Sequence, residues 1–125
     1  MPKGIIIMKY NNKSGIAIKA CHPKDTTGLP ESALMHIFNI HEFSKEAGIT
    51  SITVENLNIV TSYSGSDTDY FIVLMLNLNE DPDDYEDSLD EISHKIFKNL
   101  DNDNYIDMLP SFFKKISNVS NNEKN

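Results

Sequence analysis

The first half of the chain alternates between short apolar stretches and polar turns. The stretches Gly4–Lys9 and Ile16–Cys21 flank a cluster of turn-forming residues that ends at Gly15. A second pair, Ile49–Val54 and Leu57–Tyr63, is separated by only two polar residues. Apolar stretches of this length around a compact turn are typical of β-hairpins, so the pattern predicts two hairpins.

The stretch Tyr70–Leu76 differs from the others because its seven apolar residues follow one another without a polar break. A strand with one solvent-exposed face alternates apolar and polar residues, whereas a continuously apolar strand is covered on both sides. The stretch therefore predicts a central strand with helices packed on both faces of its sheet.

A first helix is predicted from Pro30 to about Ala47. Proline suits the first turn of a helix, where the N–H that it lacks would have no partner. Gly48 follows the pattern directly, and glycine most readily adopts the left-handed conformation that ends many helices. We therefore expect Gly48 to be the stop signal of this helix.

A second helix is predicted after the segment Asp81–Asp84. This segment places an N-cap acid, a first-turn proline and further acids in the order that helix N-termini favour. Apolar residues then recur at helical spacing, at Tyr85, Leu89, Ile92, Ile96 and Leu100.

A third helix is predicted over Ile106–Ile116, where apolar residues repeat at intervals of three and four. Pro110 within this stretch implies either a kink or a later start of the helix. Residues 118–125 are polar and are predicted to form a C-terminal tail that frays.

These elements follow the order strand, strand, helix, three strands, two helices. Apart from the connection that contains the first helix, every link between consecutive strands is hairpin-sized, so a mainly antiparallel five-stranded sheet is expected. The predicted fold class is α+β, a three-layer α/β/α sandwich with one helix on one face and two on the other. A single domain spans residues 1–117.

Composition narrows the choice of partners. The chain has 125 residues, with 11 basic residues, all of them Lys, against 19 Asp and Glu, which gives a net charge of −8. Proteins that bind nucleic acid present clustered positive charge, and Arg is their preferred contact to phosphates and bases. We therefore expect no nucleic-acid partner.

The cysteine count and the apolar runs bear on location. The single Cys21 can form no disulfide within the chain. The apolar run Ile5–Met8 is far shorter than the roughly 20 residues that a membrane-spanning helix needs. The sequence therefore predicts a cytoplasmic protein without a transmembrane segment.

Charge is unevenly distributed along the chain. Residues 1–45 hold six Lys against three acids, a net charge of +3, whereas residues 67–107 hold thirteen acids against two Lys, a net charge of −11. A solvated helix face with acids at its favourable N-terminus accounts for the acidic segment. The alternative is a surface that steers a basic partner and repels anionic membranes.

Histidine pairs offer no metal site. His36 and His41 lie five residues apart, about 140° around a helix, so they cannot share a metal as an i,i+4 pair can. His41 falls beside the main apolar stripe of the first helix, where a hydrogen-bonded core histidine is expected. This main stripe consists of Leu34, Ile37 and Phe38.

Other chemical motifs are incomplete. The segment Asp101–Asp107 imitates the start of a calcium loop, but Ile106 and Phe112 stand where that loop needs Gly and Glu, so a helix-capping linker is favoured. No glycine-rich phosphate-binding motif is present. We therefore expect no cofactor, no metal and no catalytic residues, and no enzymatic activity.

The first helix also carries a second set of apolar residues. Ile40 and Phe43 are expected on the face nearly opposite the main stripe. They either reach flanking loops or stay exposed and drive association, since large apolar residues on an outer face mark contact sites. The candidate interface residues are Met35, His36, Ile40 and Phe43.

The order of elements resembles the longin domain of the longin/roadblock superfamily, in a stand-alone form of the archaeal type. The resemblance covers residues 4–117 and implies a five-stranded antiparallel sheet with the first helix on one face and the last two on the other. It is carried by the opening strand up to Lys9 with Gly15 after the turn, by Leu34–Phe38, and by Tyr70–Leu76 leading into Asp81–Tyr85.

Domains of this kind look like non-catalytic platforms, homodimeric or heterodimeric, that bind Ras-like small GTPases or serve in membrane-traffic complexes. The resemblance thus implies a small GTPase or another longin/roadblock protein as the partner. Without Arg the chain cannot supply an arginine finger to a GTPase, so a scaffold or exchange-type role is more natural than activation.

Two other functions stay open at this point. A profilin-like actin regulator is also a small sheet between helices, but it predicts helices at both ends of the chain, whereas this chain opens with a predicted strand. An enzyme or small-ligand binder would use the histidines, and it predicts that metals or nucleotides raise the melting temperature.

Overall fold

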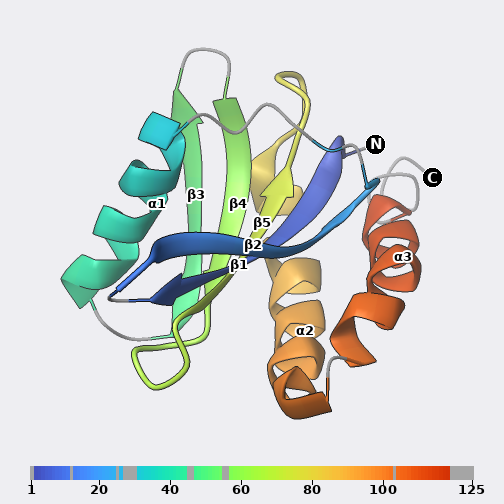
Figure 1. Cartoon of the computed structure of the whole chain (residues 1–125). Coiled ribbons are helices and arrows are strands. Elements are labelled where there is room, and N and C mark those ends of the chain that lie inside the picture. The colour runs from blue at the N-terminus through green and yellow to red at the C-terminus, as the bar shows by residue number, and fades with distance from the viewer. Residues whose placement is uncertain are drawn as a thin grey trace.

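A computed structural model describes residues 2–11, 13–24, 26, 31–44, 47–54, 57–102 and 104–118 of the chain. The strands of this part are β1 (Gly4–Asn11), β2 (Gly15–His22), β3 (Gly48–Val54), β4 (Leu57–Tyr63) and β5 (Tyr70–Met75). Its helices are α1 (Glu31–Ser44), α2 (Glu86–Phe97) and α3 (Asn104–Ser117), with the 3₁₀ turns η1 (Pro82–Asp84) and η2 (Leu100–Asn102). The α+β sandwich is confirmed: α1 covers one face of the sheet, and α2 and α3 cover the other (Figure 1).

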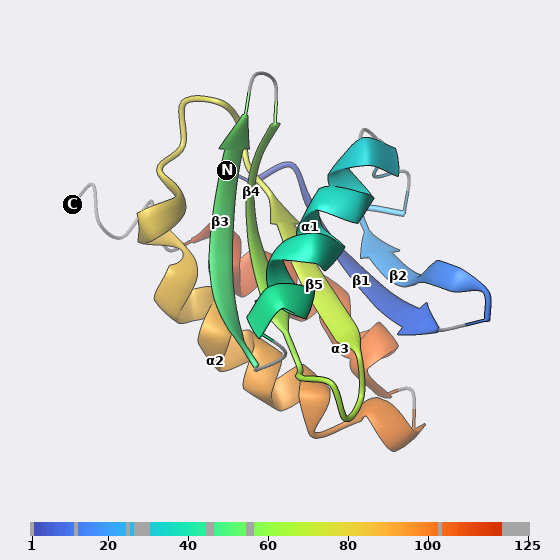
Figure 2. The same cartoon turned by 90° about the vertical axis from the view of Figure 1, so that its left-hand side faces the viewer.

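The five strands form one open sheet in the order β2-β1-β5-β4-β3, and all neighbours are antiparallel. β5 is the middle strand, and its residues Phe71–Met75 are buried. The prediction of a central strand covered on both faces is therefore confirmed. β2 and β3 lie at the two edges of the sheet (Figure 2).

The face beneath α2 and α3, the α2–α3 face, carries the larger core. β1 and β5 direct alternate residues to it, among them Ile7 and Leu74. Each fully buried side chain of this size stabilises the fold by about 1.5–3 kcal/mol. The helices contribute Leu89, Ile92 and Ile96 from α2, and Tyr105, Leu109, Phe112, Phe113 and Ile116 from α3.

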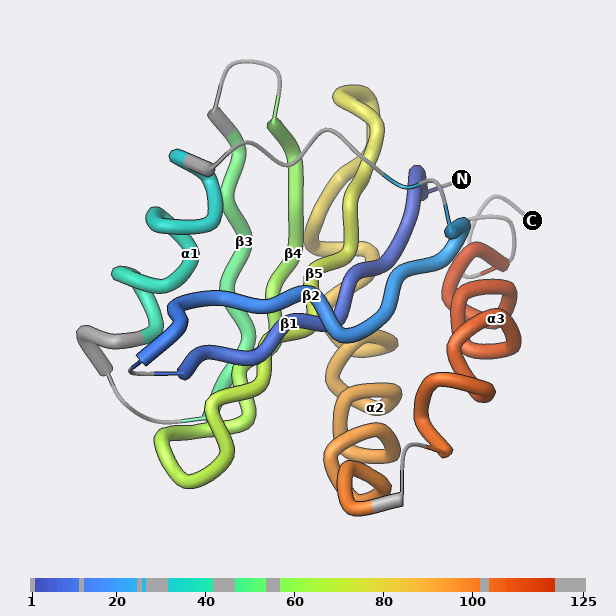
Figure 3. The backbone as a smooth tube through the Cα atoms, viewed as in Figure 1, coloured from blue at the N-terminus to red at the C-terminus, as the bar shows by residue number. Residues whose placement is uncertain are grey.

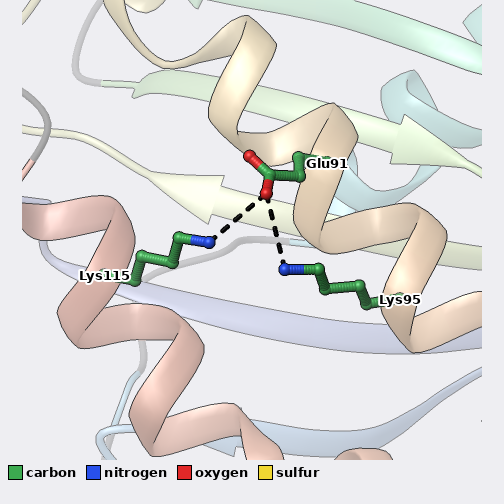
Figure 4. A network of polar contacts seen from close by, with 3 residues as sticks. All are labelled: Glu91, Lys95 and Lys115. Atoms are coloured by element: carbon green, nitrogen blue, oxygen red, sulfur yellow. Dashed lines mark hydrogen bonds and ion pairs between the residues drawn. The ribbon is translucent and has the colours of Figure 1, made fainter.

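The outer surface of this helix pair is charged. The carboxylate of Glu91 on α2 lies 3.4 Å from the Lys95 amine and 3.3 Å from the Lys115 amine of α3 (Figure 4). Hydrogen bonding and charge attraction, first from Lys115 and then from Lys95, lower the pKa of Glu91. These exposed pairs link α2 to α3 above their common core.

The opposite face, the α1 face, carries a smaller core. The alternate residues of the central strands point to it, including Ile6, Met8 and Phe71. From the described part of α1 the cluster contains one fully buried side chain, that of Ile37, with Leu34, Phe38 and Ile40 partly buried against it.

Gly15 makes the first hairpin turn possible. It starts β2 with a φ of 82°, in the left-handed region that side chains with a Cβ avoid. The predicted hairpin is confirmed, with β1 continuing to Asn11, beyond its predicted end at Lys9.

The predicted end of the first helix is wrong. α1 ends at Ser44, Ala47 lies outside the helix, and Gly48 starts β3 with a φ outside the left-handed region. Glycine is equally free to adopt extended conformations, so a glycine after a helical pattern does not by itself mark a helix stop. The predicted start at Pro30 lies outside the described residues.

The start and the end predicted for the second helix also need correction. The side chain of Asp81 accepts a hydrogen bond of 3.0 Å from the N–H of Asp83, as an N-cap does. It caps η1 rather than an α-helix, because this first turn is wound as a 3₁₀ helix. α2 itself runs from Glu86 to Phe97, and Leu100 belongs to η2.

The third helix passes through its proline. α3 begins at Asn104 and contains Pro110 in its interior, so the later start is excluded. The proline lacks the N–H that would bond to the carbonyl of Ile106, one turn earlier. Ile106 and Pro110 both lie on the exposed side of α3, where water can replace that bond. Of the predicted tail, Asn118 forms a turn, and residues 119–125 lie outside the described residues.

Candidate functional site

A groove opens between α1 and the hairpin end of β1 and β2. It has a volume of about 430 Å³. Figure 2 looks onto this face, with α1 in front of β4 and β5 and with β2 beyond it at the edge of the sheet. We call it the α1–β2 groove, and its lining residues are Tyr10, Ser14, Gly15, Ile16, Leu34, Met35 and Phe38.

Aromatic contacts build one wall of the groove. The ring centroids of Phe38 and Tyr10 are 4.3 Å apart, and those of Phe38 and Phe71 are 6.4 Å apart. Such aromatic pairs hold their rings in place more strongly than burial alone. Met35, an unbranched and adaptable side chain at the rim, is 50% exposed.

Two isoleucines of β2 extend the apolar surface beyond the groove. Ile16 pairs with Tyr10, and Ile18 pairs with Met8. Directly paired residues of an antiparallel sheet lie on the same face, and Met8 belongs to the core of the α1 face. Both isoleucines therefore point to the α1 face, where Ile18 is 59% exposed.

A β-bulge limits the regular part of β2. The register against β1 shifts next to the Met8–Ile18 pair and leaves Lys19 as the extra residue. The two strands are paired on both sides of this point, and Figure 3 shows them as neighbouring tubes of one hairpin. Because a bulge interrupts further pairing, the regular outer edge beside the groove is the segment 15–18.

The structure separates the four predicted interface residues. Met35 lines the groove, and His36 is exposed on α1 outside the lining. Ile40 is half-buried against the core of the α1 face, so its predicted position opposite the main stripe is wrong. Ile37 and Ile40 are i,i+3 neighbours on one side of the helix, which explains this. The side chain of Phe43 lies outside the described residues.

His41 is the predicted hydrogen-bonded core histidine. Its Nε2 lies 2.7 Å from Oγ1 of Thr61, and the ring is 3% exposed. The single hydroxyl proton of Thr61 points to the carbonyl of Thr50, so Nε2–H of His41 is assigned as the donor to Thr61. Burial lowers the pKa of His41 to about 4, so the ring is neutral at pH 7.

A second polar cluster holds the loop between β5 and η1. The buried Asn58 amide donates to the carbonyls of Asn77 and Glu80, at 2.9 and 2.7 Å. The Glu80 carboxylate accepts from the backbone N–H of Asn77 and from the hydroxyl of Tyr85, both at 2.7 Å. Partial burial alone would raise the pKa of Glu80, but these hydrogen bonds lower it overall. The cluster fixes the loop in place.

The described residues form neither a metal-binding cluster nor a membrane-spanning helix. Within the described ranges, no group of three His, Cys, Asp or Glu side chains could hold a metal ion. His36 and His41 do not converge, because His36 is exposed and His41 is buried against Thr61. None of the helices in the described part of the chain is long and apolar enough to cross a membrane.

Sequence reasoning missed the β2 side of the groove. Ile16 and Ile18 belong to a strand that the sequence predicts, but its place in the sheet is left open. The available signal was the weaker apolar character of this stretch, in which Lys19 follows directly, compared with Tyr70–Leu76. An edge position for this strand follows only from the pairing of β1 with β5.

The sequence comparisons identify no family or relative from which a function could be inferred. No protein-family model matches the chain, and no curated protein matches it in sequence.

Proposed function

We propose that this chain is a non-catalytic protein-interaction domain of the longin/roadblock type that holds its partner in the α1–β2 groove. The groove is the observation that carries the proposal. It is concave and mainly apolar, and the exposed side chains of Met35 and Ile18 flank it. Concave apolar sites with exposed apolar rims are typical of binding surfaces.

The type of domain is supported by the architecture. The order of elements, the antiparallel sheet and the placement of α1 opposite α2 and α3 agree with what the resemblance implies. The proposed partner is a Ras-like small GTPase or another longin/roadblock domain, in a homodimer or heterodimer that serves a membrane-traffic-type complex. The lack of Arg favours a scaffold or exchange-type role.

A cytoplasmic location belongs to the same proposal. Cys21 is half-buried and is the chain's single cysteine, so no disulfide within the chain contributes to its stability. A reducing compartment would therefore not lower the stability of such a chain.

The test compares two glutamate substitutions at exposed apolar residues. Met35→Glu places a charge at the groove, and Ile106→Glu places the same charge on α3, where Ile106 is 40% exposed. Sedimentation equilibrium measures self-association, and calorimetry measures binding of small GTPases from the same genome in both nucleotide states. We expect a dimer with a mass near twice 14.1 kDa, or a complex with a GTPase. Met35→Glu should weaken this association, and Ile106→Glu should leave it intact.

Two results would overturn the proposal. One is a wild-type chain that stays monomeric at all concentrations and binds none of the GTPases. The other is an association that Met35→Glu leaves unchanged, which would place the contact on a different surface. Circular dichroism of both variants is the control for an intact fold.

A further inference from the structure

The outer edge of β2 lies directly beside the α1–β2 groove. β2 is an edge strand, so alternate residues direct their backbone N–H and C=O groups away from β1. Its segment 15–18 pairs regularly with residues 8–11 of β1, and Gly15 and Ile16 of this segment also line the groove. An added strand at this edge would therefore place its own side chains next to the groove.

The β1–β2 hairpin that forms this edge carries charge of one sign. Residues 1–24 contain five Lys and no Asp or Glu. Lys13 and Lys19 stand at the two ends of the segment 15–18, and both are exposed. Among the described residues neither of them forms an ion pair. Lys13 and Lys19 thus offer positive charge that is not held in an ion pair with a described acid.

These lysines decide which strand the edge accepts. Lysines and bulges on an edge strand prevent pairing with an arbitrary second strand. Pairing β2 with β2 of a second copy would bring lysines of the same sign together, which is unfavourable. An added strand with acidic residues would be attracted instead, because its carboxylates would lie beside Lys13 and Lys19.

The part of the chain that the structure describes does not supply such a strand. Within the described residues its acids are concentrated between Glu80 and Glu91, in a loop, in η1 and in α2 rather than in an extended segment. The other sheet edge, β3, carries no charged residue between Gly48 and Val54 and so has no charge preference. An anionic membrane fits less well, because the site is a groove and the whole chain carries a net charge of −8.

We infer that the contacting element of the partner is an extended acidic segment, which adds to the edge of β2 at residues 15–18 and inserts an apolar side chain into the α1–β2 groove. Backbone pairing along the edge supplies affinity, and the groove and the lysines supply specificity, as in other cases of strand addition. This inference rests on the proposed function and names the chemistry of its partner.

The experiment selects random displayed dodecapeptides on the wild-type protein and measures their affinity by fluorescence polarisation. We expect enriched peptides that combine net negative charge with alternating apolar residues. Lys19→Glu and Met35→Glu should each weaken their binding about tenfold or more. The matched controls Lys98→Glu and Ile106→Glu, which place the same charges on exposed residues of the α2–α3 side, should leave binding unchanged.

Backbone pairing is tested with the same peptides. N-methylation of alternate residues removes their N–H donors, so methylation in one of the two registers should abolish binding while the other register is tolerated. Equal tolerance of both registers would overturn strand addition.

Other outcomes would also overturn the inference. These are enrichment without acidic bias, failure to enrich any peptide, binding insensitive to Lys19→Glu, or binding of phosphatidylserine-containing vesicles in place of peptides. If Met35→Glu still disrupts self-association or GTPase binding in that case, the proposed function stands and only the inference fails. If both sets of measurements are negative, both fail.

Discussion

The two faces of the sheet are closed to different degrees. On the α2–α3 face, three residues of α2 and five of α3 belong to the buried cluster. On the α1 face, the described part of α1 adds one fully buried residue to the cluster, and the α1–β2 groove stays open beside it. Two helices seal one face, and one helix leaves part of the other uncovered.

This difference separates stability from function. A face covered by two helices buries enough apolar surface to support the fold, since stability follows the area removed from water. A face with a single helix keeps apolar side chains such as Met35 and Ile18 accessible. The α1 face is therefore where we expect a partner, and the α2–α3 face is where we expect mutations to unfold the chain.

The largest effect is expected from a matched pair of core truncations. Ile96 of α2 and Ile37 of α1 are both almost fully buried. Ile96→Ala should lower the free energy of unfolding by about 4 kcal/mol, and Ile37→Ala by about 2 kcal/mol, because a site that can collapse loses less. Leu34 and Phe38, which neighbour Ile37 on the main stripe of α1, line the open groove, so this part of the helix is less tightly held and can shift toward the truncated site.

Urea denaturation of the two variants checks the comparison directly. The same substitution in a helix of each face removes the same atoms, so the difference between the variants reports how each face relaxes. Equal losses would show that the α1 face is as tightly closed as the α2–α3 face, in contradiction to the open groove.

The second effect is a pH dependence that belongs to the α1 face. The folded chain holds His41 with a pKa of about 4, below its ordinary value of 6.5, so between these values the unfolded chain binds the proton more tightly. Stability is therefore lost as the pH falls through this window. From pH 7 to pH 5 the His41 contribution should fall by about 2 kcal/mol.

His41→Gln is the variant that isolates this effect. Glutamine can still donate to Thr61 but does not titrate in this range. Urea denaturation at pH 7 and pH 5 should show a smaller loss for the variant than for the wild type. A wild-type chain that loses no more stability than the variant would show that His41 does not titrate as its burial implies.

Much of this comparison could be predicted from local patterns. The unbroken apolar run Tyr70–Leu76 correctly indicated a central strand covered on both faces, and His41 beside the main stripe correctly indicated a core histidine. Local patterns fail where distant contacts decide. The start of β3 at Gly48, which pairs with Tyr63, and the edge position of β2 depend on residues that are remote in sequence, so neither Gly48 nor Ile18 showed its role in advance.

A smaller effect is expected at the end of the α2–α3 face, where the Tyr85 hydroxyl donates to the Glu80 carboxylate. Tyr85→Phe should cost about 1 kcal/mol of unfolding free energy at pH 7, the typical contribution of one hydrogen bond. Hydrogen bonds lower the pKa of Glu80 below 4.5, so their contribution is present above this pH and is lost as the pH falls below it. The difference in unfolding free energy between wild type and variant, measured by urea denaturation, should therefore shrink in acid. A difference that stays constant down to pH 3 would argue against the hydrogen bond to the carboxylate.

The smallest effect is expected where α2 and α3 are linked by charge. Glu91→Gln removes the ion pairs with Lys95 and Lys115, all of which are exposed. Exposed pairs gain little in water and are screened by salt, so the urea midpoint should stay within experimental scatter at physiological ionic strength. A clear loss of stability that disappears at high salt would show that surface charge helps to close this face. An unchanged midpoint beside a large loss in Ile96→Ala would show that the buried side chains alone seal the α2–α3 face.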